Sequence, residues 1–206
     1  GGGVATGRWE AGVQALSVLF GGLMLVVLTR QGVHEMAAGR LTIGQLTLID
    51  GGHTISAKGN VGAAPAGWSV AMDVAIDAIS TERLIALWPV SAVPNTRTWL
   101  ATNVATGELF DVRSALRLTP GETPRFALSY QYRGAEVRFM KSLPPITDGA
   151  GYATINDNTY TMVAERGHVV PPAGGKVDIS GSVMIVPDIR EIPATADFTL
   201  RTKSSV

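Results

Sequence analysis

The chain has 206 residues and contains no cysteine, which excludes disulfides and metal sites built on thiolates. Charged residues are scarce as well, at 17% of the chain against about a quarter in an average soluble domain. The 17 basic and 17 acidic residues cancel, so the chain lacks the excess positive charge that nucleic-acid binding requires. We therefore expect no nucleic-acid partner.

The sequence is rich in apolar residues, which occur in short runs. Hydrophobic residues make up 46% of the sequence, the mean hydropathy is +0.21, and 24 glycines interrupt the apolar runs. None of the patterns of a serine hydrolase, a P-loop or a zinc protease occurs. The length suits one large β domain, and we expect neither an enzyme nor a cofactor.

Residues 79–107 are the one stretch with a helical pattern. Ser80 or Thr81 can cap a first helix, and Pro89 ends it because proline has no N–H and disfavours helix in the residue before it. A second helix is predicted directly after Pro94, with Gly107 able to end it. Two short helices, at about residues 81–104, therefore interrupt a chain of strands.

Elsewhere apolar and polar residues alternate with the period of a half-buried strand. The clearest case is the run 68–77, in which Trp68, Val70, Met72, Val74 and Ile76 oppose Ser69, Asp73 and Asp77. The alternation changes parity near Gly44 and at Arg133-Gly134, which predicts a β-bulge at each. Long strands bent by bulges indicate a strongly curved, largely antiparallel sheet that forms an open groove.

Shorter strands are predicted at 151–155 and 160–165, joined by a turn at residues 156–158. Val177, Ile179, Val183 and Ile185 alternate next, and Ala196, Phe198 and Leu200 close the chain.

Residues 11–29 carry no charge and are long enough to span a bilayer. Gly21-Gly22 divides them into two apolar runs, however, and this pair suits a hairpin turn, so we favour a hairpin and leave the membrane span as the alternative. The chain starts with three glycines and no initiator Met, so we expect it to be a piece of a longer protein.

Two short helices are too small to cover one side of a sheet of about nine strands. A second sheet, a closed barrel or a bound molecule must shield that side. Lipid is a natural filler, because burial contributes about 0.8 kcal/mol per CH₂ and a sixteen-carbon tail could gain up to roughly 12 kcal/mol without polar contacts.

Several short motifs, in this order, resemble the YhdP-type, AsmA-like envelope proteins of Gram-negative bacteria. They are Leu87-Trp88-Pro89, Asn95-Thr96-Arg97-Thr98-Trp99-Leu100, Asn103-Val104, Gly107, Leu143-Pro144-Pro145-Ile146, Gly149 with Gly151, Gly174-Gly175 and Val186-Pro187-Asp188. The resemblance covers about residues 41–206 and makes the chain a single β-groove segment, with the predicted hairpin region in residues 1–40.

The resemblance implies a function as well as a fold. Such proteins are anchored in the inner membrane, lie in the periplasm and look like bridges that carry phospholipid towards the outer membrane. The partners implied are phospholipid acyl chains and the inner membrane, the latter through an anchor outside this chain.

The strand pattern supplies candidates for the groove, on the assumption that the apolar faces of the longest strands point into it. They are Val70, Met72, Val74, Phe126, Leu128, Tyr130, Val137 and Phe139. The family motifs add residues with an expected structural role, namely Trp88, Pro89, Arg97, Trp99, Pro144 and Pro145. Trp88 and Trp99 are expected to hold the helices on the sheet, whereas Arg97 could meet a phosphate headgroup or pair with a carboxylate.

Two other classes of protein stay open. A β-sandwich or solenoid module of a secreted adhesin would have a dry core and no ligand, and a carbohydrate hydrolase would use a carboxylate pair such as Asp73 and Asp77. His34, His53 and His168 are widely spaced, and we expect surface histidines there and no metal site.

Overall fold

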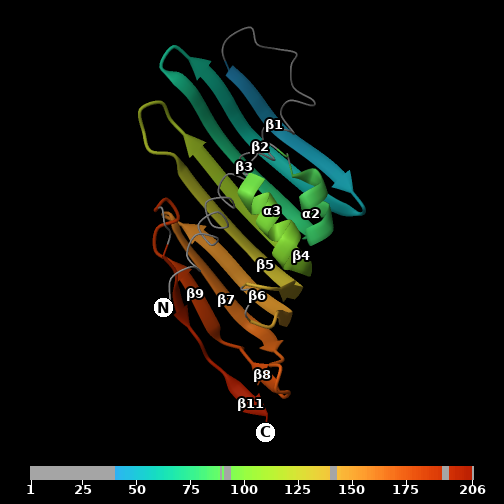
Figure 1. Ribbon diagram of the computed structural model, residues 1–206. Helices are drawn as coiled ribbons and strands as arrows, with labels where there is room; N and C mark the ends of the chain where they lie inside the picture. The colour runs from blue at the N-terminus through green and yellow to red at the C-terminus, as the bar shows by residue number, and fades with distance from the viewer. Residues whose placement is uncertain (1–39, 89, 91–93, 140–142, 192–194, 206) are drawn as a thin grey trace.

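The computed structural model describes residues 40–88, 90, 94–139, 143–191 and 195–205 (Figure 1). The predicted hairpin or span at residues 11–29 lies outside them. The described elements are β1 (Arg40–Asp50), β2 (His53–Ala64), β3 (Gly67–Ser80), α2 (Thr81–Leu87), α3 (Pro94–Asn103), β4 (Val104–Leu118), β5 (Arg125–Val137), β6 (Ile146–Asn156), β7 (Thr159–Val169), β8 (Lys176–Asp178), β9 (Ser182–Val186), β10 (Asp197–Thr199) and β11 (Lys203–Ser205).

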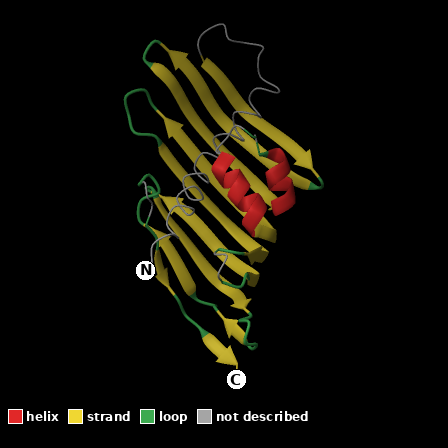
Figure 2. Cartoon of the chain, viewed as in Figure 1, coloured by secondary structure: helices red, strands yellow, loops and turns green. Residues whose placement is uncertain are grey.

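The strands form one antiparallel sheet, in the order β1-β2-β3-β4-β5-β6-β7-β8-β11, with β9 paired to β7 and β10 paired to β9. From β1 to β7 each strand pairs with the next along the chain, so this part is a simple meander. Strands β1 and β11 lie at opposite ends of the sheet, which does not close into a barrel (Figure 2). The predicted open, antiparallel, mostly β architecture is confirmed.

The cross-strand register collects apolar side chains on one side of the sheet. Ile55 of β2 pairs with Ile76 of β3, which pairs with Val112 of β4. Ile76 and Val112 have no solvent-accessible surface, and Met72 is 1% exposed. The alternation predicted for residues 68–77 is thus the alternation of a half-buried strand with one apolar and one polar side.

Both predicted bulges are present. The β1–β2 register shifts between Ile43 and Leu46, and the β5–β6 register shifts between Tyr132 and Ala135, where Gly134 has φ of 60°. Other register shifts were not predicted, among them the one between Phe110 and Arg113 in the β4–β5 pairing. The parity changes there, since Leu109 pairs with the buried Tyr132 and Phe110 with the exposed Gln131, but two adjacent apolar residues hide this change in the sequence.

The first helix follows its sequence signals closely. The Ser80 hydroxyl accepts a hydrogen bond from the Arg83 N–H at 3.2 Å, as expected of an N-cap. The second helix ends at Asn103, close to the predicted end at about residue 104, but Gly107 does not end it, because Val104 already pairs with Val137 as the first residue of β4. Both helices lie on the same side of the sheet, and they contact β3 and β4 (Figure 2).

The strands predicted at 151–155 and 160–165 are longer in the structure, where they are β6 and β7. Strand β6 begins directly after Pro145, ahead of the predicted start at Gly151, and so also includes Gly149. A Cβ added at Gly151 would clash with the carbonyl oxygen of Val163 in β7, so the neighbouring strand leaves no room for a side chain there. The turn that joins the two strands is as predicted, with positive φ at Asp157 and Asn158.

Strand β3 approaches Gly59 of β2 closely, and this contact gives a testable prediction. Its φ is +153°, and an added Cβ would meet the carbonyl oxygen of Ala71 and the Cα of Met72, both backbone atoms of the neighbouring strand. Gly59→Ala should lower the free energy of unfolding by about 2 kcal/mol, measured by urea denaturation. Gly44→Ala is the control, because nothing lies within 4 Å of the position of its Cβ, and a similar loss in both variants would contradict the explanation.

Candidate apolar binding face

Six of the eight predicted groove residues lie together on the apolar side of the sheet, which we call the apolar face. Met72 pairs with Leu116, which pairs with Phe126, and one row further along the strands Val74 and Leu128 lie on either side of Ser114. Val70 lies two residues from Met72 along β3, and Tyr130 lies two residues from Leu128 along β5, both on the same side of the sheet. The strands that were predicted separately are therefore brought side by side through β4.

The other two predicted groove residues lie apart from these six. Val137 is the last residue of β5 and packs against the buried cluster, whereas Phe139 lies beyond the strand. The ring of Phe139 is 6.1 Å from that of Trp99 in α3. These two residues therefore belong to the region near the helices and not to the middle of the apolar face.

The apolar face is wider than the sequence suggested. Its further buried members come from the neighbouring strands and are Ile155, Ala153, Tyr160, Met184 and Val186. Val183 and Ile185, the apolar residues used to predict this strand, do not point to this side, because β9 pairs with β7 through Tyr160–Val186 and Met162–Met184, which leaves Ile185 38% exposed. An apolar residue at every position from 183 to 186 hid the parity.

At one end, the apolar face is only half-buried. Val70 pairs with Leu118, and Leu116 pairs with Phe126, at the ends of β3, β4 and β5 that lie furthest along the strands from the helices. All four side chains are intermediate in exposure, whereas Met72, Val74 and Leu128 next to them are buried. We call these four residues the half-buried end of the apolar face.

Three tyrosine hydroxyls lie within the apolar face. The Tyr130 and Tyr160 hydroxyl oxygens are 3.0 Å apart, and the Tyr132 hydroxyl donates to the Val163 carbonyl at 2.9 Å. Burial raises the pKa of Tyr130 to about 12 and also raises the pKa of Tyr132 and Tyr160 above the usual value for tyrosine. The face is therefore uncharged near neutral pH, as contact with an apolar ligand requires.

Helices α2 and α3 lie on the apolar face (Figure 1). Leu84 and Trp88 of this region are buried in the same cluster as the sheet residues, with Trp88 3% exposed. Arg97 donates to the Ile85 carbonyl at 3.4 Å and so connects α3 to α2. Among the other family-motif residues, Pro144 and Pro145 are half-buried just ahead of β6, and Pro89 lies outside the described residues.

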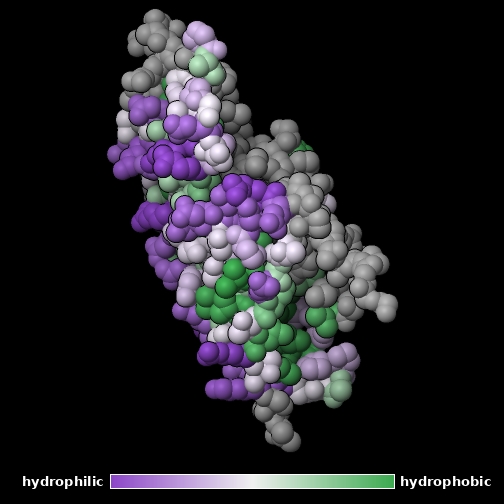
Figure 3. All heavy atoms as spheres, turned by 90° about the vertical axis from the view of Figure 1, so that its left-hand side faces the viewer, coloured by the Kyte–Doolittle hydropathy of each residue, from purple (hydrophilic) through white to green (hydrophobic). Residues whose placement is uncertain are grey.

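The opposite side of the sheet, which we call the polar face, carries ion pairs. Arg117 contacts Asp73 at 2.7 Å, and Arg133 binds both carboxylate oxygens of Glu108, at 2.8 and 2.9 Å. The hydrogen bonds from Arg133 hold the pKa of Glu108 below its usual value. Figure 3 shows hydrophilic side chains along one side of the molecule, with hydrophobic ones beside them in the lower part of the view.

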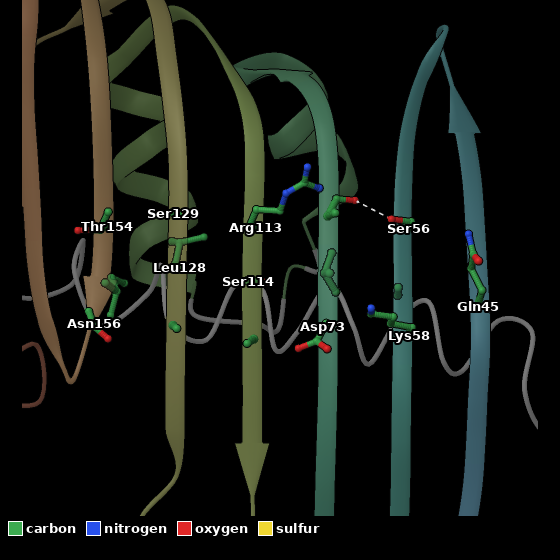
Figure 4. A pocket seen from close by; sticks show the side chains of 16 residues that line it. Gln45, Ser56, Lys58, Asp73, Arg113, Ser114, Leu128, Ser129, Thr154 and Asn156 are labelled. Carbon is green, nitrogen blue, oxygen red and sulfur yellow. Dashed lines mark hydrogen bonds between the residues drawn. The ribbon is translucent and has the colours of Figure 1, made fainter.

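The polar face also has a hollow of about 900 Å³, which spans β1 to β6 (Figure 4). Polar and charged side chains line it, among them Lys58, Asp73, Arg113, Ser129 and Thr154. Among the described residues that line the hollow, Asp73 is the one carboxylate.

The carboxylates considered for catalysis are held by local partners. Asp73 pairs with Arg117, and Asp77 accepts a hydrogen bond from the Thr54 N–H at 2.8 Å, which lowers the pKa of Asp77. Asp73 and Asp77 are four residues apart on one strand, which corresponds to about 13 Å. This separation exceeds the roughly 6.5–9.5 Å typical of paired glycosidase carboxylates.

The two histidines in the described part of the chain lie far apart. His53, at the start of β2, is 3.6 Å from Asp77, whereas His168 in β7 lies 2.9 Å from the Thr147 hydroxyl. His34 lies outside the described residues. Within the residues that the structure describes, no group of His, Asp and Glu side chains could hold a metal ion.

The buried tyrosines predict a stability change at alkaline pH. The pKa of Tyr130 is about 12 in the folded chain and about 10 in the unfolded chain, so the stabilisation by the neutral hydroxyls is complete below pH 10 and is lost as the pH rises towards 12. Tyr130→Phe/Tyr160→Phe, which removes both members of the pair, should lose less unfolding free energy between pH 9 and 11.5 than the unsubstituted chain. Equal losses in urea denaturation would contradict the assignment.

The described residues thus form one extended apolar face on the side of the sheet that carries the helices. None of the described helices is long and apolar enough to cross a membrane. Comparison of the chain with protein-family models, with curated proteins and with solved structures finds no match.

Proposed function

We propose that the apolar face binds acyl chains of phospholipid and that the protein carries lipid along it. The observation that carries this proposal is the one-sided sheet. Apolar side chains continue across β2 to β9 on one side, the sheet is open, and the described residues contain no second sheet that packs against it.

The dimensions and energetics suit an acyl chain. A strand of 14 residues, such as β3, is about 45 Å long, which exceeds the length of a fully extended sixteen-carbon tail. Each CH₂ group that leaves water contributes about 0.8 kcal/mol, so many weak contacts suffice and no polar motif is needed. Headgroups would remain in water at the ends of the strands while the tails move passively along the face.

The half-buried end of the apolar face is the place where lipid would enter. Val70, Leu116, Leu118 and Phe126 form a continuous group there, still reached by solvent, next to the fully buried Met72. At the other end Trp88 and Leu84 cover the sheet. An acyl chain at Phe126 can therefore contact these four side chains without displacing either helix.

The cellular setting follows from the resemblance to the AsmA-like proteins. We propose that this chain is a segment of a periplasmic lipid bridge, anchored in the inner membrane of a Gram-negative bacterium by a part outside this sequence. The ordered motifs support this, and so does their position, since Trp88 and Arg97 lie in or beside the two helices on the apolar face. In this setting the lipid is phospholipid on its way between the inner and outer membranes.

Native mass spectrometry of the purified chain, expressed in a Gram-negative host, tests the proposal. Phospholipid should stay bound, and Phe126→Asp should reduce the lipid-bound fraction at least about tenfold, because a charge on the apolar face opposes acyl-chain contact. Ala127→Asp is the matched control, since this neighbouring residue is exposed on the polar face. Lipid loss of equal size in both variants, or no bound lipid in the unsubstituted chain, would contradict the proposal.

The two alternative functions, an adhesin module and a hydrolase, predict different results in the same preparation. A dry-core module of a secreted adhesin should carry no lipid and should be unaffected by added phospholipid vesicles. A hydrolase should lose activity on Asp73→Asn or Asp77→Asn, whereas lipid binding should survive both changes because these residues lie on the polar face.

A further inference from the structure

The hollow on the polar face lies on the opposite side of the sheet from the apolar face, so its chemistry is separate from lipid binding. Its volume of about 900 Å³ is within the range of about 300–1,000 Å³ that is typical of ligand sites. The hollow crosses the strands from β1 to β6, which at about 4.8 Å between neighbouring strands gives a length of about 24 Å. These dimensions suit an elongated ligand better than a single small ion.

One row of the strand pairing runs through the hollow and places an arginine among small and hydroxyl-bearing side chains. From β2 to β6 the row consists of Ser56, Ala75, Arg113, Ser129 and Thr154. Figure 4 shows the side chain of Arg113 reaching from β4 towards β3. Within the described residues, neither the Ser129 nor the Thr154 hydroxyl has a hydrogen-bond partner. Both hydroxyls are therefore available to a ligand that lies beside Arg113.

The charges in the hollow favour an anion. Its lining includes the cations Lys58 and Arg113 and the carboxylate of Asp73, which Arg117 contacts at 2.7 Å. Arg113 is exposed and forms no ion pair with any residue that the structure describes. The hollow therefore has an excess of positive charge, and Arg113 can bind a carboxylate or phosphate group through two parallel N–H···O bonds.

A second arginine near the hollow also lacks an acidic partner. Arg125 lies directly opposite Arg117 in the β4–β5 pairing, where like charges repel one another, and Arg117 is directed to Asp73 on the other side. Arg125 is exposed, and none of the described residues pairs with it. It lies four residues along β5 from the row of Arg113, about 13 Å away, with the small Ala127 between. One elongated anionic ligand can therefore reach both arginines.

An exposed aromatic ring lies beside the hollow on β6. Tyr152 is two residues before Thr154, on the same side of the strand, and is 42% exposed. Its side chain combines an apolar ring face with a polar hydroxyl. A sugar ring matches this combination, because it carries C–H groups on its faces and hydroxyl groups at its edge.

We propose that the hollow binds an acidic oligosaccharide, that is, a chain of sugar rings that bear carboxylate or phosphate groups. Arg113 binds an acidic group, the Ser129 and Thr154 hydroxyls bond to sugar hydroxyls, and Tyr152 packs against a ring. The hydroxyls and the aromatic ring favour a sugar over a bare anion, and the two arginines favour an acidic sugar over a neutral one.

Isothermal titration calorimetry of the whole chain with a hexamer of galacturonic acid tests the proposal. The hexamer should bind with a dissociation constant of about 0.1 mM. Arg113→Gln should raise this constant at least about tenfold, because the charge-assisted bonds to the guanidinium are lost. Arg138→Gln is the matched control, since Arg138 is an exposed arginine just beyond the other end of β5, and it should leave the constant unchanged. Circular dichroism confirms that each variant is folded.

Other ligands identify the part of the sugar that is recognised. A phosphorylated mannose pentamer shows whether phosphate replaces carboxylate, and the acidic sugar that binds more tightly identifies the acidic group. Maltohexaose, which is neutral, should bind at least about tenfold more weakly than the acidic sugars. Inorganic phosphate and phosphatidylglycerol vesicles carry the charge without the sugar chain and should bind less tightly as well.

Several results would overturn the proposal. They are the absence of binding by either acidic sugar up to about 10 mM, binding of maltohexaose as tight as theirs, and an equal loss of affinity in Arg113→Gln and Arg138→Gln. Binding of phosphate or of the vesicles as tight as that of the sugars would also overturn it, because the site would then recognise negative charge alone.

Discussion

The register of the antiparallel ladders is the constraint on which the rest of this structure depends. Side chains alternate between the two sides of a strand, so a slip by one residue would move every apolar group of that strand to the polar face. From β2 to β7 the pairing keeps rows such as Val74, Ser114 and Leu128 aligned. The apolar face is a product of this alignment, since no single strand buries enough surface to be stable alone.

The one-sidedness of the sheet links its stability to the proposed function. Charges are kept on the polar face, where Asp73 and Glu108 bind arginines, and the hydroxyls on the apolar face are neutral and mostly bonded to one another or to backbone. A face built in this way favours contact with acyl chains and offers little to a polar substrate. The two helices cover it near Trp88 and leave it half-buried near Phe126.

Within the described residues, the same meander places β1 at one end of the sheet. A sheet that grows by adding each strand beside the previous one always ends in an edge, and here the first described strand is long and uncharged over residues 41–49.

The sequence by itself determined the features that rest on local chemistry. Alternation identified β3, parity changes identified the bulges near Gly44 and Gly134, and the Ser80 cap placed α2, because each depends on residues next to one another in the chain. Only the tertiary structure decided the side on which Ile185 lies, the end of α3 at Asn103 and the bulge before Arg113, since strand pairing sets all three. It also decided that Phe139 lies beside Trp99 and not among the other groove candidates, because a position beyond the end of a strand is fixed by packing and not by periodicity.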